Sequence, residues 1–307
     1  MNRILKVLTC CAALCAAGVM ASAQVKEIRH DFSAFNAVEV DYDFNVNVVT
    51  SDKDYSISLT VDDVLTDYVK TYVKGRTLYI SFDKKSLPKD IKNLYKGRKS
   101  DKPTLMATVY APKDITSFKL SAKAVLSVEN EIECEDFKLE LDELSSVKKI
   151  SVNADKAVIK SNNTASANMI IYADELEIEA DGKSSLDMDA SVENLNLKAA
   201  GACSILYTGE TVNANLDLSG SSKATMKGNA LYLGVTGSNS SSLDAINLKT
   251  PEASVKLSNS SKVTEAATEK LHIEMSGNST LVFDNDPAVD IISIKSSTVT
   301  RYEPSKK

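Results

Sequence analysis

The chain has 307 residues, with 36 Lys and Arg against 42 Asp and Glu, which gives a formal net charge of −6 at pH 7. This acidic balance argues against a nucleic-acid partner, because binding to a phosphate backbone requires clustered cations. Ser, Asn, Asp, Val and Ile are abundant and Trp is absent, a composition that favours strands and tight turns over helices.

Residues 1–23 have the organisation of a secretory signal peptide. Arg3 and Lys6 give a positive start, a short apolar run follows, and small residues precede Gln24. The apolar run is shorter than the ~20 residues of a membrane-spanning helix, and no later stretch approaches that length. We therefore expect cleavage between Ala23 and Gln24, export to the periplasm or the cell surface, and no transmembrane span.

Residues 24–112 are predicted to form an irregular β region with one short helix. The expected strands, of which the first two form an alternating run that could be a first turn, are Val38–Val40, Phe44–Val48, Ser56–Val61 and Thr77–Phe82. Between the third and fourth strands, Asp62 and Asp63 are expected to cap a short helix that ends at Tyr72.

A polar insert follows from Lys84 to Pro103, with many lysines and two prolines. We expect a mobile, solvated excursion at this place. The alternative hypothesis is a docking patch for an anionic glycan or lipid.

Residues 113–307 contain a motif that recurs every 18 to 21 residues. Each copy has an alternating apolar pair, a corner residue, small residues and a second apolar pair. The corner residues are Ala122, Glu143, Asn163, Gly182, Gly201, Gly220, Asn239, Asn259, Gly277 and, approximately, Lys295. Because one copy with two short strands cannot bury its own apolar face, the repeat predicts an all-β, right-handed parallel β-solenoid, continuous with the preceding region.

The columns of the repeat are chemically uniform. Residues four positions before and four after each corner are apolar, and those two after it are small. Their spacing places all three columns on the inward faces of the strands. Ser222 should therefore be buried and the next residue, Lys223, exposed.

Two outward columns complete the pattern. Three positions before the corners, opposite charges alternate along most of the chain, as expected if successive turns stack ~4.8 Å apart. Three positions after the corners stand Ser146, Ser166, Ser185, Ser204 and Ser242. These serines are interpreted either as a ladder that permits tight stacking or as a flat hydrogen-bonding strip for a glycan or peptide.

Several segments together resemble a known family. They are Arg29–Phe35 followed by Val38–Val40, the Asp62-Asp63 segment leading to Thr77–Ile80, and the Ser-Gly-Ser-Ser corner at residues 219–222. The chain resembles the head GIN domain family of putative autotransporter adhesins, common in Bacteroidetes envelope proteins, over nearly all of its mature length. This resemblance implies a β-helix-like fold, export and an adhesion role, and it carries over no catalytic residues.

The sequence shows no catalytic, cofactor-binding or metal-ligating pattern. His30 and His272 lack the spacing of a zinc site, so each is interpreted as a surface histidine. No phosphate-binding glycine loop, nucleophile elbow or Cys/His pattern is present. Cys134 and Cys203 fall more than three turns apart, ~15 Å along the stack, which exceeds the ~7 Å that a disulfide spans between Cα atoms.

An enzyme of the carbohydrate-cleaving β-helix type is the catalytic alternative. Lyases of this type use Arg, Lys or His near an acidic calcium site, whereas this chain has no Arg between Arg98 and Arg301. A hydrolase with paired carboxylates stays open, because acidic residues are abundant, although their spacing follows the outward columns. Examples are Asp181, Asp187, Asp217 and Asp244.

The function predicted from these observations is an exported cell-envelope module that binds a ligand without catalysis. A glycan or a protein at the cell surface is the expected partner, and no cofactor is expected. A structural spacer in the envelope is the first alternative, and the carbohydrate-active enzyme is the second.

Overall fold

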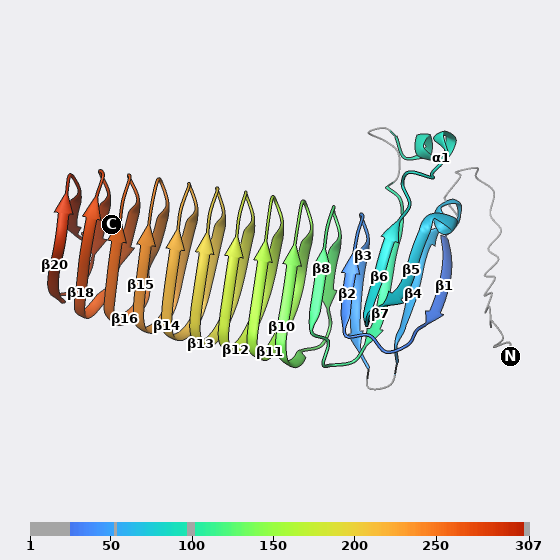
Figure 1. Cartoon of the computed structure of the whole chain (residues 1–307), viewed down its shortest axis with the longest axis horizontal. Coiled ribbons are helices and arrows are strands. Elements are labelled where there is room, and N and C mark those ends of the chain that lie inside the picture. The colour runs from blue at the N-terminus through green and yellow to red at the C-terminus, as the bar shows by residue number, and fades with distance from the viewer. Residues whose placement is uncertain (1–24, 52–53, 97–101, 304–307) are drawn as a thin grey trace.

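A computed structural model describes residues 25–51, 54–96 and 102–303 of the chain. Its strands stack into a long β-solenoid with an elaborated N-terminal end (Figure 1). The predicted signal peptide and most of its cleavage site lie outside the described residues.

The corners of the repeat have a left-handed backbone, which explains why Gly and Asn recur there. The nine corners from Ala122 to Gly277 have φ between 52° and 75°. Only Gly adopts this conformation without cost, and Asn tolerates it better than most residues. The last corner is Ser296, with φ of 49°, so the approximate assignment to Lys295 was one residue early.

The strands of the regular part run from one corner to the next, and most bend between the two faces of the solenoid. They are β8 (Ser117–Leu120), β9 (Val125–Val128), β10 (Ile132–Leu141), β11 (Ser146–Ser161), β12 (Ser166–Ala180), β13 (Ser185–Ala199), β14 (Ser204–Leu218), β15 (Lys223–Gly237), β16 (Ser242–Leu257), β17 (Lys262–Glu265), β18 (Ala267–Ser276), β19 (Thr280–Phe283), β20 (Ala288–Lys295) and β21 (Thr298–Arg301). Every pairing among them is parallel.

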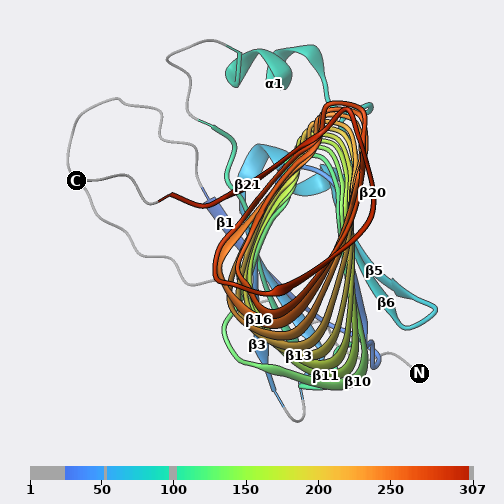
Figure 2. The same ribbon diagram turned by 90° about the vertical axis from the view of Figure 1, so that its left-hand side faces the viewer.

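The solenoid is right-handed, as predicted. In Figure 1 the chain climbs the front face, turns over the row of corners, descends behind and advances from right to left. Figure 2 shows the same turns from the C-terminal end, with β20 on one side of the coil and β21 on the other. The same hand prevails in parallel crossovers generally.

The N-terminal elements are strands with two short helices. They are β1 (Val25–Asp31), β2 (Ala37–Val40), β3 (Asn45–Thr50), β4 (Ser56–Asp62), the 3-10 helix η1 (Asp63–Tyr68), β5 (Val69–Lys74), β6 (Thr77–Phe82), α1 (Lys89–Leu94) and β7 (Leu105–Ala111). The β2–β3 pair is a solenoid turn, because it pairs in parallel with β8 and β9 on one side.

On its other side, the β2–β3 turn pairs in parallel with β6 and β7. The β6–β7 segment is therefore a further turn, in which residues 83–104 replace the tight corner. Figure 1 shows α1 above the row of corners at this end. Antiparallel strands complete the end of the stack: β4 pairs with β7, β1 with β4, and β5 with β6.

The helix expected after Asp62 is shorter than predicted. Only Asp63–Tyr68 is helical, and Val69–Lys74 is a strand that pairs with β6. Asp62 does not cap the helix with its side chain; it is 2% exposed and accepts hydrogen bonds from Tyr95 and Thr104 instead. Long-range partners have overridden a valid local capping pattern.

The inward columns are buried as the sequence indicates. The small column from Ala124 to Ser279 is buried throughout, Ser222 is 0% exposed, and Lys223 is exposed. The large column is buried up to Ile273, but Ile291 in the terminal turn is 57% exposed. Ile291 lies on β20, the last strand on its face of the stack, beyond which no described turn follows.

The charged outward column is also in register. Lys160 lies beside Glu179, with 2.6 Å between Nζ and Oε2, and Lys256 lies 3.0 Å from Glu274. Each such exposed pair contributes only about 0–1 kcal/mol. The column therefore supports the stacking and adds little to stability.

Candidate functional site

The five predicted serines lie in one straight outward column directly after the corners. Ser146, Ser166, Ser185 and Ser204 follow one another in register on four consecutive turns. Lys223 takes the next place, and Ser242 comes after it. The structure thus assembles a serine strip, defined by these five residues and interrupted by one lysine, and its side chains are half-buried or exposed.

The opposite face, formed by the strand halves that precede the corners, carries a hollow of about 390 Å³. An outward column runs across it through Asn215, Gly234, Ser254 and His272 in successive turns. Gly234 on β15 contributes no side chain, so the surface is lowered there. A Cβ at Gly234 would lie 2.9 Å from Asn215 Oδ1 and 3.1 Å from Tyr232 Cε1. We call this hollow the Gly234 groove.

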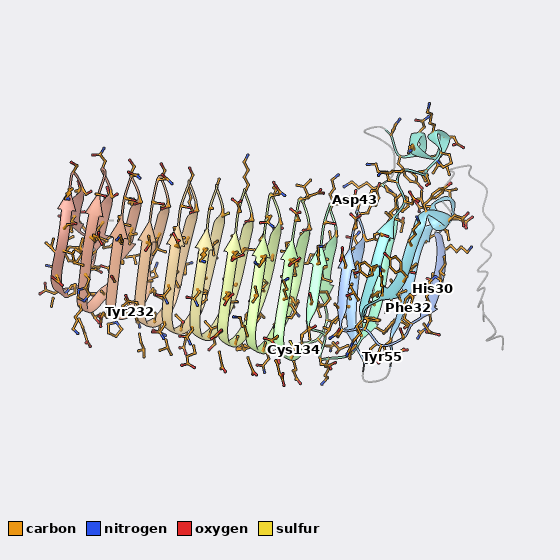
Figure 3. The ribbon with its side chains drawn as sticks, in the orientation of Figure 1. His30, Phe32, Asp43, Tyr55, Cys134 and Tyr232 are labelled. Atoms are coloured by element: carbon orange, nitrogen blue, oxygen red, sulfur yellow. The ribbon has the colours of Figure 1, made fainter. Side chains whose placement is uncertain are left out.

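Polar groups and one aromatic ring surround the Gly234 groove. Tyr232, labelled on the front face in Figure 3, lines it from the same strand. Asp217 and Lys256 line it from neighbouring turns. His272 is half-buried at one end, with Nδ1 3.1 Å from Asp290 Oδ2 and Nε2 3.6 Å from Glu252 Oε1.

The family model described as "Putative auto-transporter adhesin, head GIN domain" matches residues 34–214 and 189–287. The chain belongs to this head GIN domain family. The match covers the corners, the first turn and both candidate surfaces, which confirms the resemblance seen in the sequence.

Solved structures share the fold of this head GIN domain. A putative adhesin from Parabacteroides distasonis ATCC 8503 is 18% identical, with 91% of this chain and 98% of that chain covered and a TM-score of 0.54. A putative adhesin from Parabacteroides merdae ATCC 43184 is 17% identical, with 91% and 96% covered and a TM-score of 0.46. A putative lipid binding protein from Parabacteroides distasonis ATCC 8503 is 15% identical, with 91% and 97% covered and a TM-score of 0.43. No match was found among curated proteins.

The carboxylates considered for hydrolysis stay apart in the head GIN domain. Asp187 and Asp244 share a column but are three turns apart, and Asp217 lies in a column of the opposite face. Asp181 accepts a hydrogen bond from the Gly182 N–H at its own corner. These four residues therefore do not form the paired site that a glycoside hydrolase needs.

Both mature cysteines are unpaired thiols. Cys203 is 1% exposed in the small inward column, and its Sγ donates a hydrogen bond to the Ala200 carbonyl. Burial raises the pKa of Cys134 to about 11, with help from nearby carboxylates such as Asp136. A thiol with so high a pKa stays protonated at neutral pH and is a poor nucleophile.

Two further findings concern the described part of the chain. Within residues 25–51, 54–96 and 102–303, no group of three or more His, Cys, Asp or Glu side chains is placed to hold a metal ion. In the same ranges, no helix is long and apolar enough to span a membrane.

Sequence reasoning did not single out Tyr232 and Gly234, although a pattern for them exists. The column five positions before the corners contains Asn215, Gly234 and Ser254, so Gly234 marks a missing side chain among polar neighbours. A glycine inside a strand often marks a place where a ligand or another backbone approaches closely.

Proposed function

We propose that this head GIN domain is an exported binding module of the cell envelope that holds a glycan in the Gly234 groove without catalysing a reaction. The observation that carries the proposal is the groove itself, a hollow with an aromatic wall and a polar floor. Its volume of about 390 Å³ lies at the lower end of the ~300–1,000 Å³ of small-molecule sites.

The chemistry of the Gly234 groove matches that of a sugar ring. A pyranose has an apolar C–H face, which can lie against the ring of Tyr232, and a rim of hydroxyl groups. Asn215 and Ser254 offer neutral donors and acceptors at the floor, and Asp217 and Lys256 offer charged ones. Such groups can hold hydroxyls by several hydrogen bonds, each of modest net strength.

Replacement of Tyr232 by Ala should weaken glycan binding roughly tenfold, because the apolar face of the sugar loses its partner. The measurement is a glycan array with the mature protein, followed by titration of the strongest glycan. Tyr172→Ala is the matched control, since Tyr172 is an exposed tyrosine outside the groove, and it should bind as the unaltered protein does.

The same titration separates the groove from the serine strip and from a spacer role. Ser185→Lys together with Ser204→Lys alters the strip and leaves the groove intact. If that double variant loses binding while Tyr232→Ala keeps it, the strip is the binding surface and the groove hypothesis is wrong. If the unaltered protein retains no glycan at all, the spacer interpretation replaces the binding module.

Export is the second part of the proposal, and it rests on the organisation of residues 1–23 together with family membership. We expect the mature protein in the periplasm or at the cell surface to begin at Gln24. Edman sequencing or intact-mass measurement of protein from fractionated cells tests this. Recovery of a chain that retains Met1, or of one acylated on a leader cysteine, would contradict it.

A further inference from the structure

A second hollow lies at the other end of the molecule, where the insert replaces a corner. It has a volume of about 320 Å³ and lies between the solenoid and the α1 segment. Its apolar lining includes Leu65 and Leu105, which are 2% and 1% exposed, and Leu87, which is 8% exposed. We call this hollow the insert pocket.

Tyr42 occupies an unusual place in the insert pocket. It lies between β2 and β3, where other turns of the solenoid have their corner, and its φ is 93°. A bulky residue with a positive φ is a genuine outlier, and such strain is typical of ligand-binding sites. The strained backbone presents the ring to Phe82, with the two ring centroids 4.7 Å apart and the planes at 22°. Both rings line the pocket.

The wall formed by the insert is fixed to the solenoid. The Tyr95 hydroxyl donates a hydrogen bond of 2.8 Å to Asp62 Oδ2, and the Thr104 N–H donates one of 3.2 Å to the same oxygen. Burial, with this carboxylate, raises the pKa of Tyr95. Because Asp62 is itself 2% exposed, the wall on both sides of the pocket is held by a buried anchor.

The charge around the insert pocket is opposite to that of the whole chain. Lys84, Lys92 and Lys96 line it, and no acidic residue does so among the described residues. Lys84 Nζ lies 5.7 Å from the centroid of the Tyr42 ring. An apolar floor with three cations in an acidic protein is complementary to an amphipathic anion.

We propose that the insert pocket binds a soluble amphipathic carboxylate. Its apolar body packs against Tyr42, Phe82 and the buried leucines, and its carboxylate lies among the lysines. This site is independent of the Gly234 groove, which lies on later turns of the solenoid.

The test is isothermal titration of the mature protein with sodium decanoate below its micelle concentration. Saturable binding at one site is expected, and octanoate should bind about sixteenfold more weakly, because each methylene contributes roughly a factor of four. Lys92→Gln should weaken decanoate binding about fivefold through loss of one cation. Lys89→Gln is the matched control on the same helix, since Lys89 is exposed and does not line the pocket.

Four results would overturn the proposal. These are no saturation with decanoate, equal affinity for the uncharged decyl glucoside, an equal loss in Lys89→Gln and Lys92→Gln, or binding only to vesicles of anionic phospholipid. Tyr232→Ala should bind decanoate like the unaltered protein, so failure of the glycan proposal leaves this one intact.

Discussion

Replacement of Gly228 by Ala should destabilise the solenoid by about 4 kcal/mol or more, among the largest effects of any single substitution in this chain. Gly228 lies where β15 bends between the two faces, with φ of 116°. A Cβ at this position would lie 1.9 Å from the carbonyl oxygen of Gly209, its partner in the preceding turn. A backbone atom cannot move aside as a flexible side chain can, so the two turns must separate.

Two costs combine at Gly228, and a control variant separates them. The backbone conformation alone costs a non-glycine residue about 1–3 kcal/mol. Gly75, with φ of 59°, has no atom within 4 Å of its Cβ position, so Gly75→Ala carries the conformational cost without the collision. In urea unfolding followed by circular dichroism, Gly228→Ala should lower the midpoint much further than Gly75→Ala. Equal losses would show that the turns can move apart freely.

The regular part of the fold could be predicted because each turn repeats the same physical problem. A corner needs a left-handed residue, the position two residues later has no room for a large side chain, and the strands on either side alternate. Gly201, Cys203 and Ile205 show all three requirements in one turn. The bend glycines Gly209 and Gly228 also lie one repeat apart, but their requirement comes from close contact between neighbouring turns.

The N-terminal end could be predicted only in part, because its order in space differs from its order in sequence. The β6–β7 turn lies outside the β2–β3 turn although it comes later in the chain. No local pattern indicates this arrangement. Asp62 illustrates the same limit, because its hydrogen-bond partners Tyr95 and Thr104 are 33 and 42 residues away.

The candidate surfaces divide in the same way. The serine strip could be predicted because it follows one column of the repeat. The Gly234 groove depends on an absent side chain and on the neighbouring Tyr232, so it becomes visible only when adjacent columns are set side by side. The insert pocket could not be predicted, since Tyr42, Leu65 and Leu105 come from three separate segments.

One inward position breaks the apolar pattern and has consequences for stability. Six positions after the corners, Met188, Tyr207 and Met226 point into the core, and Glu265 on β17 occupies the same column with 0% exposure. Its Oε2 accepts a hydrogen bond of 2.6 Å from the Ala267 N–H, while its Oε1 has no partner among the described residues. Burial, reinforced by the negative charge of Asp284, raises the pKa of Glu265 from 4.5 to about 7.

The raised pKa makes the protein less stable as the pH rises. Between pH 4.5 and about 7 the folded chain keeps the proton of Glu265 while the unfolded chain releases it, so the free energy of unfolding falls across this window. The loss from this group is about 3 kcal/mol once the pH exceeds 7. Glu265→Gln keeps the shape of the side chain and removes the titration.

Glu265→Gln should therefore unfold at nearly the same urea concentration as the unaltered protein at pH 4 and at a clearly higher one at pH 8. The difference in unfolding free energy between the two proteins should grow by about 3 kcal/mol over this range. Glu133→Gln is the control, because Glu133 is exposed on β10 and should follow the unaltered protein at both pH values. If Glu265→Gln also follows the unaltered protein at both pH values, the Glu265 carboxyl has access to water or to a cation, and its pKa is not raised by burial.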